Sequence, residues 1–191
     1  YDVKGINYLG DIGLHIGKLI VAWELWLDKK ALEKNPVQEL LRLYVKFCDS
    51  ENTEYNEELE EEFQDNEWTI KAKEKLKLLE LGDKTAHKIW QDITKSSKKG
   101  FNQVYKMLNV NFHETTGQSL FSDAGKKIIT EAVKNKKAKI DTDGAIYILL
   151  GELKKYILRS NGTASYITQD IGAATERYKK YKFDKMIYVT D

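Results

Sequence analysis

The sequence contains few of the residues that build disulfides or metal centres. Its 191 residues include one cysteine and three histidines. The single cysteine, Cys48, excludes an internal disulfide and a cysteine-based zinc cluster, and its apolar neighbours predict a buried thiol. The histidines His15, His87 and His113 lie far apart with no ligand spacing, so we expect no metal site.

Neither sign of charge dominates, and long apolar runs are absent. Lys and Arg number 31 and Asp and Glu 30, so the net charge of +1 neither favours nor excludes nucleic acid. Residues 51–67 are acidic and the later half carries lysine clusters, a pattern typical of solvated faces. No apolar run approaches the roughly 18 residues that a membrane span needs. We therefore expect an intracellular protein that does not enter a membrane.

The length of 191 residues is enough for a single domain with a real core. The chain begins at Tyr1 rather than at methionine, and residues 3–8 already have the pattern of a strand. This start predicts a fragment or a processed product.

Hydrophobic spacing predicts an α/β protein. Helical periodicity predicts helices at residues 14–27 and 37–47. A further helical stretch ends at Gly82-Asp83. Asp83 is expected to cap the next helix, which Gly100 bends or breaks. Short strands are predicted at 110–113, 138–141, 145–150, 154–159 and 185–189, the last with the apolar run of a strand inside a parallel sheet. The pattern indicates helices on a mixed sheet, with a helical insertion over approximately 29–108.

Residues 160–174 carry the strongest chemical signal. A strand leads into the turn pair Asn161-Gly162, a second extended piece carries Tyr166, and Asp170 opens a helix. Ligands of α/β sheets bind where strands feed helices, and a carboxylate there suits a cationic group. The alternative interpretation is a hairpin followed by a helix for which Asp170 is only the N-cap.

Five segments in order resemble arginyl-tRNA synthetase, a class I enzyme, and most closely its fungal cytosolic and mitochondrial branch. Gly117-Gln118-Ser119 stands where the family has Gly-Glu-Ser. The other four segments are Asn7-Tyr8-Leu9-Gly10-Asp11-x-Gly13, Leu81-Gly82-Asp83-x-x-Ala86-x-Lys88-Ile89-Trp90, Ser160-Asn161-Gly162-Thr163 with Tyr166, Thr168 and Asp170, and the run from Tyr178 to Val189. The similarity is collinear over essentially the whole chain.

The resemblance implies part of a Rossmann-type catalytic core, forming a single domain over 1–191 with its helical insertion. It further implies a reaction in which ATP, with Mg²⁺, activates L-arginine for transfer to tRNA. By the same resemblance Tyr166 and Asp170 contact the arginine substrate with Gln118 assisting, and no protein side chain acts as a nucleophile. A carboxylate suits the planar donor fork of a guanidinium.

The site departs from the family pattern in several places. Gln118 is neutral where the family has a second carboxylate, so it accepts a hydrogen bond without charge assistance. The family's HIGH and KMSKS motifs, which hold ATP, are expected outside this segment. The run His15-Ile16-Gly17-Lys18 imitates HIGH but lacks its final histidine, and out of context such a match is weak.

Two functions therefore stay open. The chain is either the central piece of a synthetase catalytic domain, inactive alone, or a degenerate relative that binds protein or RNA as a scaffold within a larger assembly. A general nucleotide-binding module is disfavoured, because the sequence has no glycine-rich phosphate loop.

Overall fold

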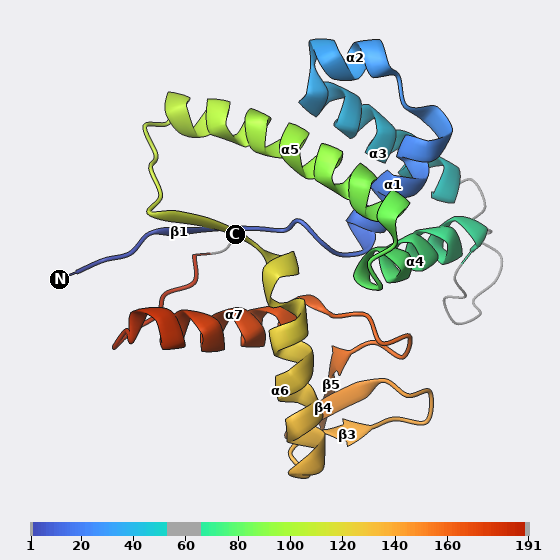
Figure 1. Ribbon diagram of the computed structural model, residues 1–191. Helices are drawn as coiled ribbons and strands as arrows, with labels where there is room; N and C mark the ends of the chain where they lie inside the picture. The colour runs from blue at the N-terminus through green and yellow to red at the C-terminus, as the bar shows by residue number, and fades with distance from the viewer. Residues whose placement is uncertain (1, 53–65, 190–191) are drawn as a thin grey trace. The chain divides into compact units, whose positions relative to one another are not determined.

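The computed structural model of the chain describes residues 2–52 and 66–189 (Figure 1). Most of the acidic stretch predicted at 51–67 lies outside these residues. The chain forms two compact units. The first, called here the helical unit, comprises Tyr1–Asn7 and Asp11–Thr115, and the second, called the sheet unit, comprises Tyr8–Gly10 and Thr116–Asp191.

The helical unit contains α1 (Leu14–Trp26), α2 (Lys29–Lys34), α3 (Pro36–Asn52), α4 (Glu67–Glu80) and α5 (Lys84–Met107). Side chains cap helices α2, α4 and α5, among others, because the first backbone N–H groups of a helix have no partner inside it. Asp28 accepts from the first turn of α2, Asn66 from Thr69 N of α4 at 2.9 Å, and Asp83 from Ala86 N of α5 at 2.9 Å. The predicted cap at Asp83 is confirmed.

Helix α5 runs through Gly100, so the predicted break is wrong. The glycine serves helix packing. Gly100 is buried, and a Cβ at this position would lie 2.2 Å from Cγ2 of Val37 on α3. The absent side chain thus lets α3 and α5 approach each other.

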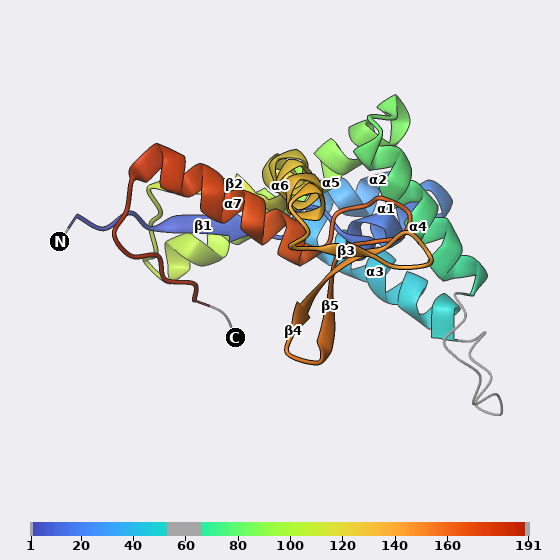
Figure 2. The same cartoon turned by 90° about the horizontal axis from the view of Figure 1, so that it is seen from below.

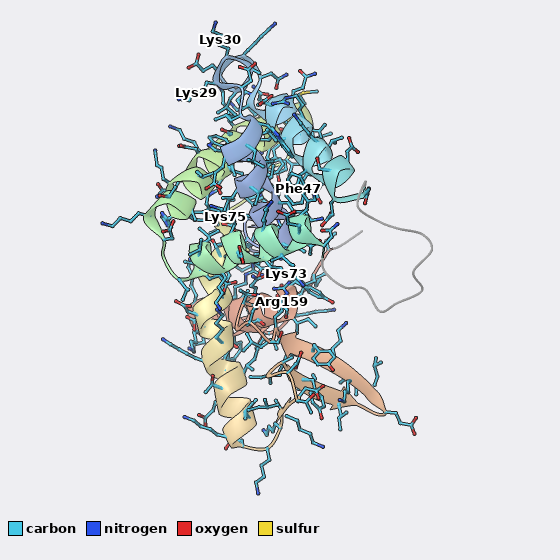
Figure 3. The ribbon with its side chains drawn as sticks, turned by 90° about the vertical axis from the view of Figure 1, so that its right-hand side faces the viewer. Lys29, Lys30, Phe47, Lys73, Lys75 and Arg159 are labelled. Carbon is cyan, nitrogen blue, oxygen red and sulfur yellow. The ribbon has the colours of Figure 1, made fainter. Side chains whose placement is uncertain are left out.

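The core of the helical unit is apolar and centred on α1. Phe47 of α3 is fully buried and meets the ring of Trp68 edge to face at 5.5 Å. Figure 3 shows Phe47 on α3, whereas Lys29 and Lys30 extend outward from the start of α2. Helices α1 and α4 cross at Gly17, whose Cβ would lie 2.1 Å from the carbonyl oxygen of Ala72. Cys48, predicted to be buried, is only half-buried because it lies beside the fully buried face of α3.

The sheet unit combines two helices with a three-stranded antiparallel sheet in the order β3-β4-β5. Its elements are η1 (Gln118–Phe121), α6 (Ser122–Lys134), β3 (Lys139–Ile140), β4 (Ile146–Leu150), β5 (Leu153–Leu158) and α7 (Tyr166–Tyr181). Strands β4 and β5 form the hairpin that is prominent in Figure 2. Ile129, Ala138 and Ile157 form the buried cluster between α6 and this sheet.

Two glycines bring α6 and η1 against α7. A Cβ on Gly125 would lie 1.9 Å from the carbonyl oxygen of Thr168, and one on Gly172 would lie 2.4 Å from that of Phe121. No side chain fits at either position, so the backbones meet directly. This close approach positions the first two turns of α7.

A second, two-stranded sheet pairs β1 (Ile6–Leu9) with β2 (Glu114–Gly117), which run in the same direction (Figure 1). The mixture of helices and strands confirms the predicted α/β class. The strand predicted at 110–113 is wrong by four residues, because Asn109 has a left-handed backbone and the chain becomes extended only afterwards.

The strand predicted at 185–189 is also wrong. Residues 182–189 pair with no strand in either sheet of the described chain, and Ile187 and Val189 are 72% and 93% exposed. An apolar run forms a strand only beside a partner that accepts its backbone hydrogen bonds. Among the described helices, none has the length and apolar character to cross a membrane.

Candidate functional site

The candidate site is built on the turn that joins β5 to α7. Asn161 and Gly162 form the predicted turn, with Gly162 at a φ of 79° and its N–H donating to Arg159 O at 2.9 Å. The Asn161 side chain accepts from the backbone N–H and the hydroxyl of Thr163, at 3.0 and 2.8 Å. Arg159, labelled in Figure 3, donates to the carbonyl of Ala164. Side-chain-to-backbone hydrogen bonds of this kind are typical of a turn.

Helix α7 begins at Tyr166, so the extended piece predicted there is wrong, and Asp170 is not the N-cap. The cap is Ser165, which forms a reciprocal capping box with Thr168. Both hydroxyls also reach the carbonyl oxygen of Ile157 on β5, at 3.0 Å from Ser165 Oγ. A capping box satisfies two free N–H groups at once, so the helix starts four residues earlier than the carboxylate predicted.

Tyr166 and Asp170 consequently lie one turn apart on the same side of α7. The ring of Tyr166 is 58% exposed, and Lys155 Nζ of β5 lies 5.9 Å from its centroid. Asp170 is half-buried. An exposed aromatic ring thus stands beside a carboxylate that water reaches only in part.

Tyr8 of β1 lies beside Asp170 and changes its electrostatics. Burial raises the pKa of the Asp170 carboxyl, and the Tyr8 hydroxyl and the positive charge of Arg177 oppose this rise. Burial and the neighbouring carboxylate also raise the pKa of Tyr8. The Tyr8 hydroxyl is close enough to act on Asp170, but within the described residues it is buried without a well-aligned hydrogen bond.

Arg177 lies two turns after Asp170 and is buried. Its guanidinium carbon is 4.3 Å from the ring centroid of Tyr8 and 5.6 Å from that of Phe121, both cation–π distances. Nη2 donates to Thr116 Oγ1 at 3.4 Å, whereas Nε has no hydrogen-bond partner among the described residues. Two aromatic faces, the Tyr188 hydroxyl and the Asp170 carboxylate thus all interact with the arginine charge.

Gln118 begins η1, directly after β2. Its Oε1 lies 3.6 Å from the position that a Cβ on Gly10 would occupy, so it lies against the backbone after β1. Within the described residues no hydrogen bond joins Gln118 to Tyr166 or Asp170. The structure thus brings Tyr166 and Asp170 together on one helix and places Gln118 at the start of a neighbouring element.

The imitation of HIGH at residues 15–18 lies inside α1, in the helical unit. Gly17 is buried at the crossing with α4, against the carbonyl of Ala72. Helix packing alone explains the glycine at this position. In the part of the chain that the structure describes, no three His, Cys, Asp or Glu side chains gather as metal ligands would.

Two residues of this arrangement, Tyr8 and Arg177, were not predicted as site residues. The spacing of Arg177 from Asp170 was a usable signal, because residues seven apart share one helix face. Tyr8 gave no such signal, since 162 positions separate it from Asp170 and only the tertiary structure brings them together.

The geometry can be compared with known proteins. The family model described as tRNA synthetases class I (R), catalytic domain, matches residues 1–191. The chain belongs to this family. Similar proteins include the arginine–tRNA ligase of Clostridioides difficile (strain 630), 39% identical over 197 residues that cover 99% of this chain and 33% of that protein. That of Clostridium botulinum (strain Langeland) is 40% identical over 192 residues, covering 99% of this chain and 32% of the relative.

This member of the arginyl-tRNA synthetase family thus spans about a third of the length of those relatives. A crystal structure of arginyl-tRNA synthetase from Plasmodium falciparum superposes with a TM-score of 0.63 at 20% identity, covering 91% of this chain and 27% of that chain. At this identity the likeness shows the fold, and it confirms the predicted class I α/β architecture. The single-domain boundaries and the insertion at 29–108 stay predictions.

Proposed function

We propose that this chain is the central piece of an arginyl-tRNA synthetase catalytic domain and holds the arginine substrate at the start of α7. Asp170 binds a cationic group of arginine, Tyr166 supplies an aromatic hydroxyl one turn earlier, and Gln118 assists as a neutral acceptor. The piece positions one substrate of the reaction and contributes no nucleophile, so its part in catalysis is orientation.

One observation carries this proposal, namely the state of Asp170. Burial raises the pKa of this carboxyl, and in the described residues no Lys or Arg nitrogen lies within 4.0 Å of it. A half-buried carboxylate without an ion-pair partner gains free energy when a cationic ligand arrives. A guanidinium fits better than an ammonium, because its planar donors can bond both carboxylate oxygens.

ATP with Mg²⁺ and the tRNA belong to the complete reaction. We propose that other parts of a whole synthetase hold the phosphates, and that this chain alone does not aminoacylate. The neutral Gln118 weakens the arginine site relative to a carboxylate, since charge assistance roughly doubles the strength of a hydrogen bond. Cytoplasm and mitochondria stay alternative locations.

Calorimetric titration of the chain with L-arginine, and with L-lysine for comparison, tests the proposal. We expect arginine-selective binding at millimolar concentration or tighter, which Asp170→Asn weakens at least tenfold by removing a charge-assisted hydrogen bond. Glu176→Gln is the matched control, because Glu176 lies on the same helix and pairs with the exposed Lys179. Equal binding of both amino acids, or loss in the control as well, would contradict the assignment.

Gln118→Glu is the complementary variant, because it is expected to increase the affinity for arginine. Restoring a second carboxylate should strengthen arginine binding severalfold, provided that Gln118 faces the ligand. An unchanged affinity in a variant that binds arginine would remove Gln118 from the site while keeping Asp170.

A second candidate, a scaffold that binds protein or RNA, is favoured by one structural feature besides Gln118. The β4–β5 hairpin exposes Leu149, Leu150 and Leu153 by 48%, 58% and 64%. Exposed apolar residues that gather at one place are typical of interaction surfaces. Absence of arginine binding in the titration would favour this candidate.

A further inference from the structure

The cluster formed by Tyr8, Arg177 and Asp170 has more polar groups than its internal contacts satisfy. The Tyr8 hydroxyl and Arg177 Nε are both buried without a hydrogen bond in the described chain. Burying such groups unpaired costs free energy, and the cost is tolerated where a function needs it. Both groups belong to residues that interact with the half-buried Asp170 carboxylate, so a function connected with this carboxylate is indicated.

Tyr8 interacts with both charged side chains, Arg177 and Asp170. The face of its ring carries the Arg177 guanidinium at 4.3 Å, whereas its hydroxyl lies on the side of Asp170. Phe121 contacts the same ring edge to face at 6.0 Å and fixes its orientation. A rotation of the Asp170 side chain would therefore align it with a donor that is already in place.

Arg177 is the positive charge nearest to Asp170 on α7, two helical turns away. Among the described residues that face this part of α7, Tyr8 comes from β1 and Tyr188 from the segment after α7, and burial raises the pKa of both phenols. Phe121 of η1 and Gly125 of α6 have no ionisable side chain. Arg177 thus supplies the positive potential that partly compensates for the burial of Asp170.

We propose that Arg177 and Tyr8 are positioning residues for Asp170: the Arg177 charge keeps the carboxylate ionised in the ligand-free protein, and the Tyr8 hydroxyl aims it. Neither residue touches the ligand. The inference rests on the proposed function of Asp170 in binding arginine. It adds that these two neighbours keep the carboxylate ionised and oriented at the acid end of the working pH range.

Carbon-13 NMR of the Asp170 side-chain carboxyl, assigned by comparison with Asp170→Asn, reads this effect without any ligand. In Arg177→Met the titration midpoint should rise by about one pH unit, the effect of removing an opposite charge. Arg177→Lys should restore the midpoint because it keeps the charge. Thr116→Val is the matched control, since it removes the 3.4 Å hydrogen bond of Arg177 and leaves every charge in place.

Tyr8→Phe tests the second residue and also covers the case in which Arg177→Met does not fold. The lost hydroxyl has no well-aligned hydrogen bond, so folding should not suffer. Because this hydroxyl acts on Asp170, its removal should raise the midpoint of the carboxyl and weaken arginine binding severalfold. A ring that acts only by packing would leave both unchanged in this variant.

Arginine titration across pH completes the test. In Arg177→Met the pH at which half of the affinity is lost should move upward together with the carboxyl midpoint, a roughly tenfold weakening on the acid side for one unit. A purely structural role would weaken binding equally at every pH. An unmoved midpoint in folded Arg177→Met would overturn the proposal, whatever the arginine result. A moved midpoint without arginine binding to the unmodified chain would instead overturn the proposed function.

Discussion

The two units of the molecule treat buried polar groups differently. Among the described residues, the helical unit has one buried charged side chain, Glu39, and all of its bonds are made. Glu39 accepts from Arg42 Nε at 2.7 Å, from Arg42 Nη2 at 2.6 Å and from Asp28 N at 3.0 Å. The sheet unit buries several polar side chains. In its described residues three buried atoms stay without a hydrogen bond, the Tyr8 hydroxyl, Ser122 Oγ and Arg177 Nε, against one in the helical unit, Thr94 Oγ1.

This difference separates structural from functional polarity. A buried group with every bond made stabilises one conformation, whereas a buried group left unpaired lowers stability and stays available to a ligand or a neighbour. Each of the following changes tests whether the helical unit is built for stability and the sheet unit for binding.

The largest effect should come from the core of the helical unit. Phe47→Ala removes a fully buried ring and leaves a cavity, which should lower the free energy of unfolding by about 3–5 kcal/mol. Urea unfolding measures the change. Val45→Ala on the exposed side of α3, where Val45 is 48% exposed, should cost less than about 1 kcal/mol. Similar losses in both variants would contradict a tightly packed core.

The next effect compares the helix crossings of the two units. Gly125→Ala places a Cβ 1.9 Å from a backbone carbonyl of α7, and Gly17→Ala places one 2.1 Å from a carbonyl of α4. Each should cost about 1–3 kcal/mol or more through overpacking, although alanine favours the helix by about 1 kcal/mol. Thermal unfolding compares them directly. If Gly125→Ala alone is tolerated, the sheet unit is the looser of the two.

Two carboxylates should respond in opposite directions. The pKa of Glu39 is lowered, first by its hydrogen bonds to Arg42, so its contribution to stability is present at neutral pH and is lost as pH falls below about 4.3 and through the folded pKa. The pKa of Asp170 is raised by burial, so its contribution falls as pH rises from about 3.9 through the folded pKa.

Glu39→Gln should therefore lower the free energy of unfolding at pH 7 by about 1.5–3 kcal/mol, the strength of hydrogen bonds to a charged group. Asp170→Asn should raise it slightly, by roughly 0.5 kcal/mol or less after solvent screening. Urea unfolding at pH 4 and pH 7 measures the change in the free energy of unfolding for both variants. A destabilised Asp170→Asn would make this carboxylate a structural group.

A smaller effect is expected for an unpaired hydroxyl. Ser122→Ala removes a buried oxygen that makes no hydrogen bond in the described chain, so stability should stay unchanged or rise by up to about 1 kcal/mol. Ser165→Ala is the contrast within the same unit, since it removes the cap of α7 and should cost about 1 kcal/mol. Equal losses would show that the Ser122 hydroxyl finds a partner in solution.

The smallest effect concerns a half-buried carboxylate of the sheet unit, Asp141. Hydrogen bonds from Tyr156 at 2.6 Å and Lys154 at 3.0 Å lower the pKa of Asp141 to about 2. Tyr156→Phe should return the NMR titration midpoint of Asp141 part of the way toward about 3.9, with little change in stability. An unchanged midpoint would show that the tyrosine does not hold this bond in solution.

The sequence predicted what depends on neighbours along the chain. The cap at Asp83 and the turn at Asn161-Gly162 were confirmed, because a few adjacent residues determine each of them. The start of α7 was misplaced for the same reason. Ser165 and Thr168 compete locally with Asp170, and the reciprocal pair forms more hydrogen bonds.

By itself, the sequence determined the family, the α/β class and the placement of Tyr166 and Asp170 one turn apart, since motifs and helical spacing are carried by the order of residues. Only the tertiary structure decided what surrounds Asp170, because burial and the proximity of Tyr8 arise from packing between segments far apart in the chain. It also decided that residues 185–189 stay outside both sheets of the described chain. A strand depends on a partner, and no local sequence pattern contains one.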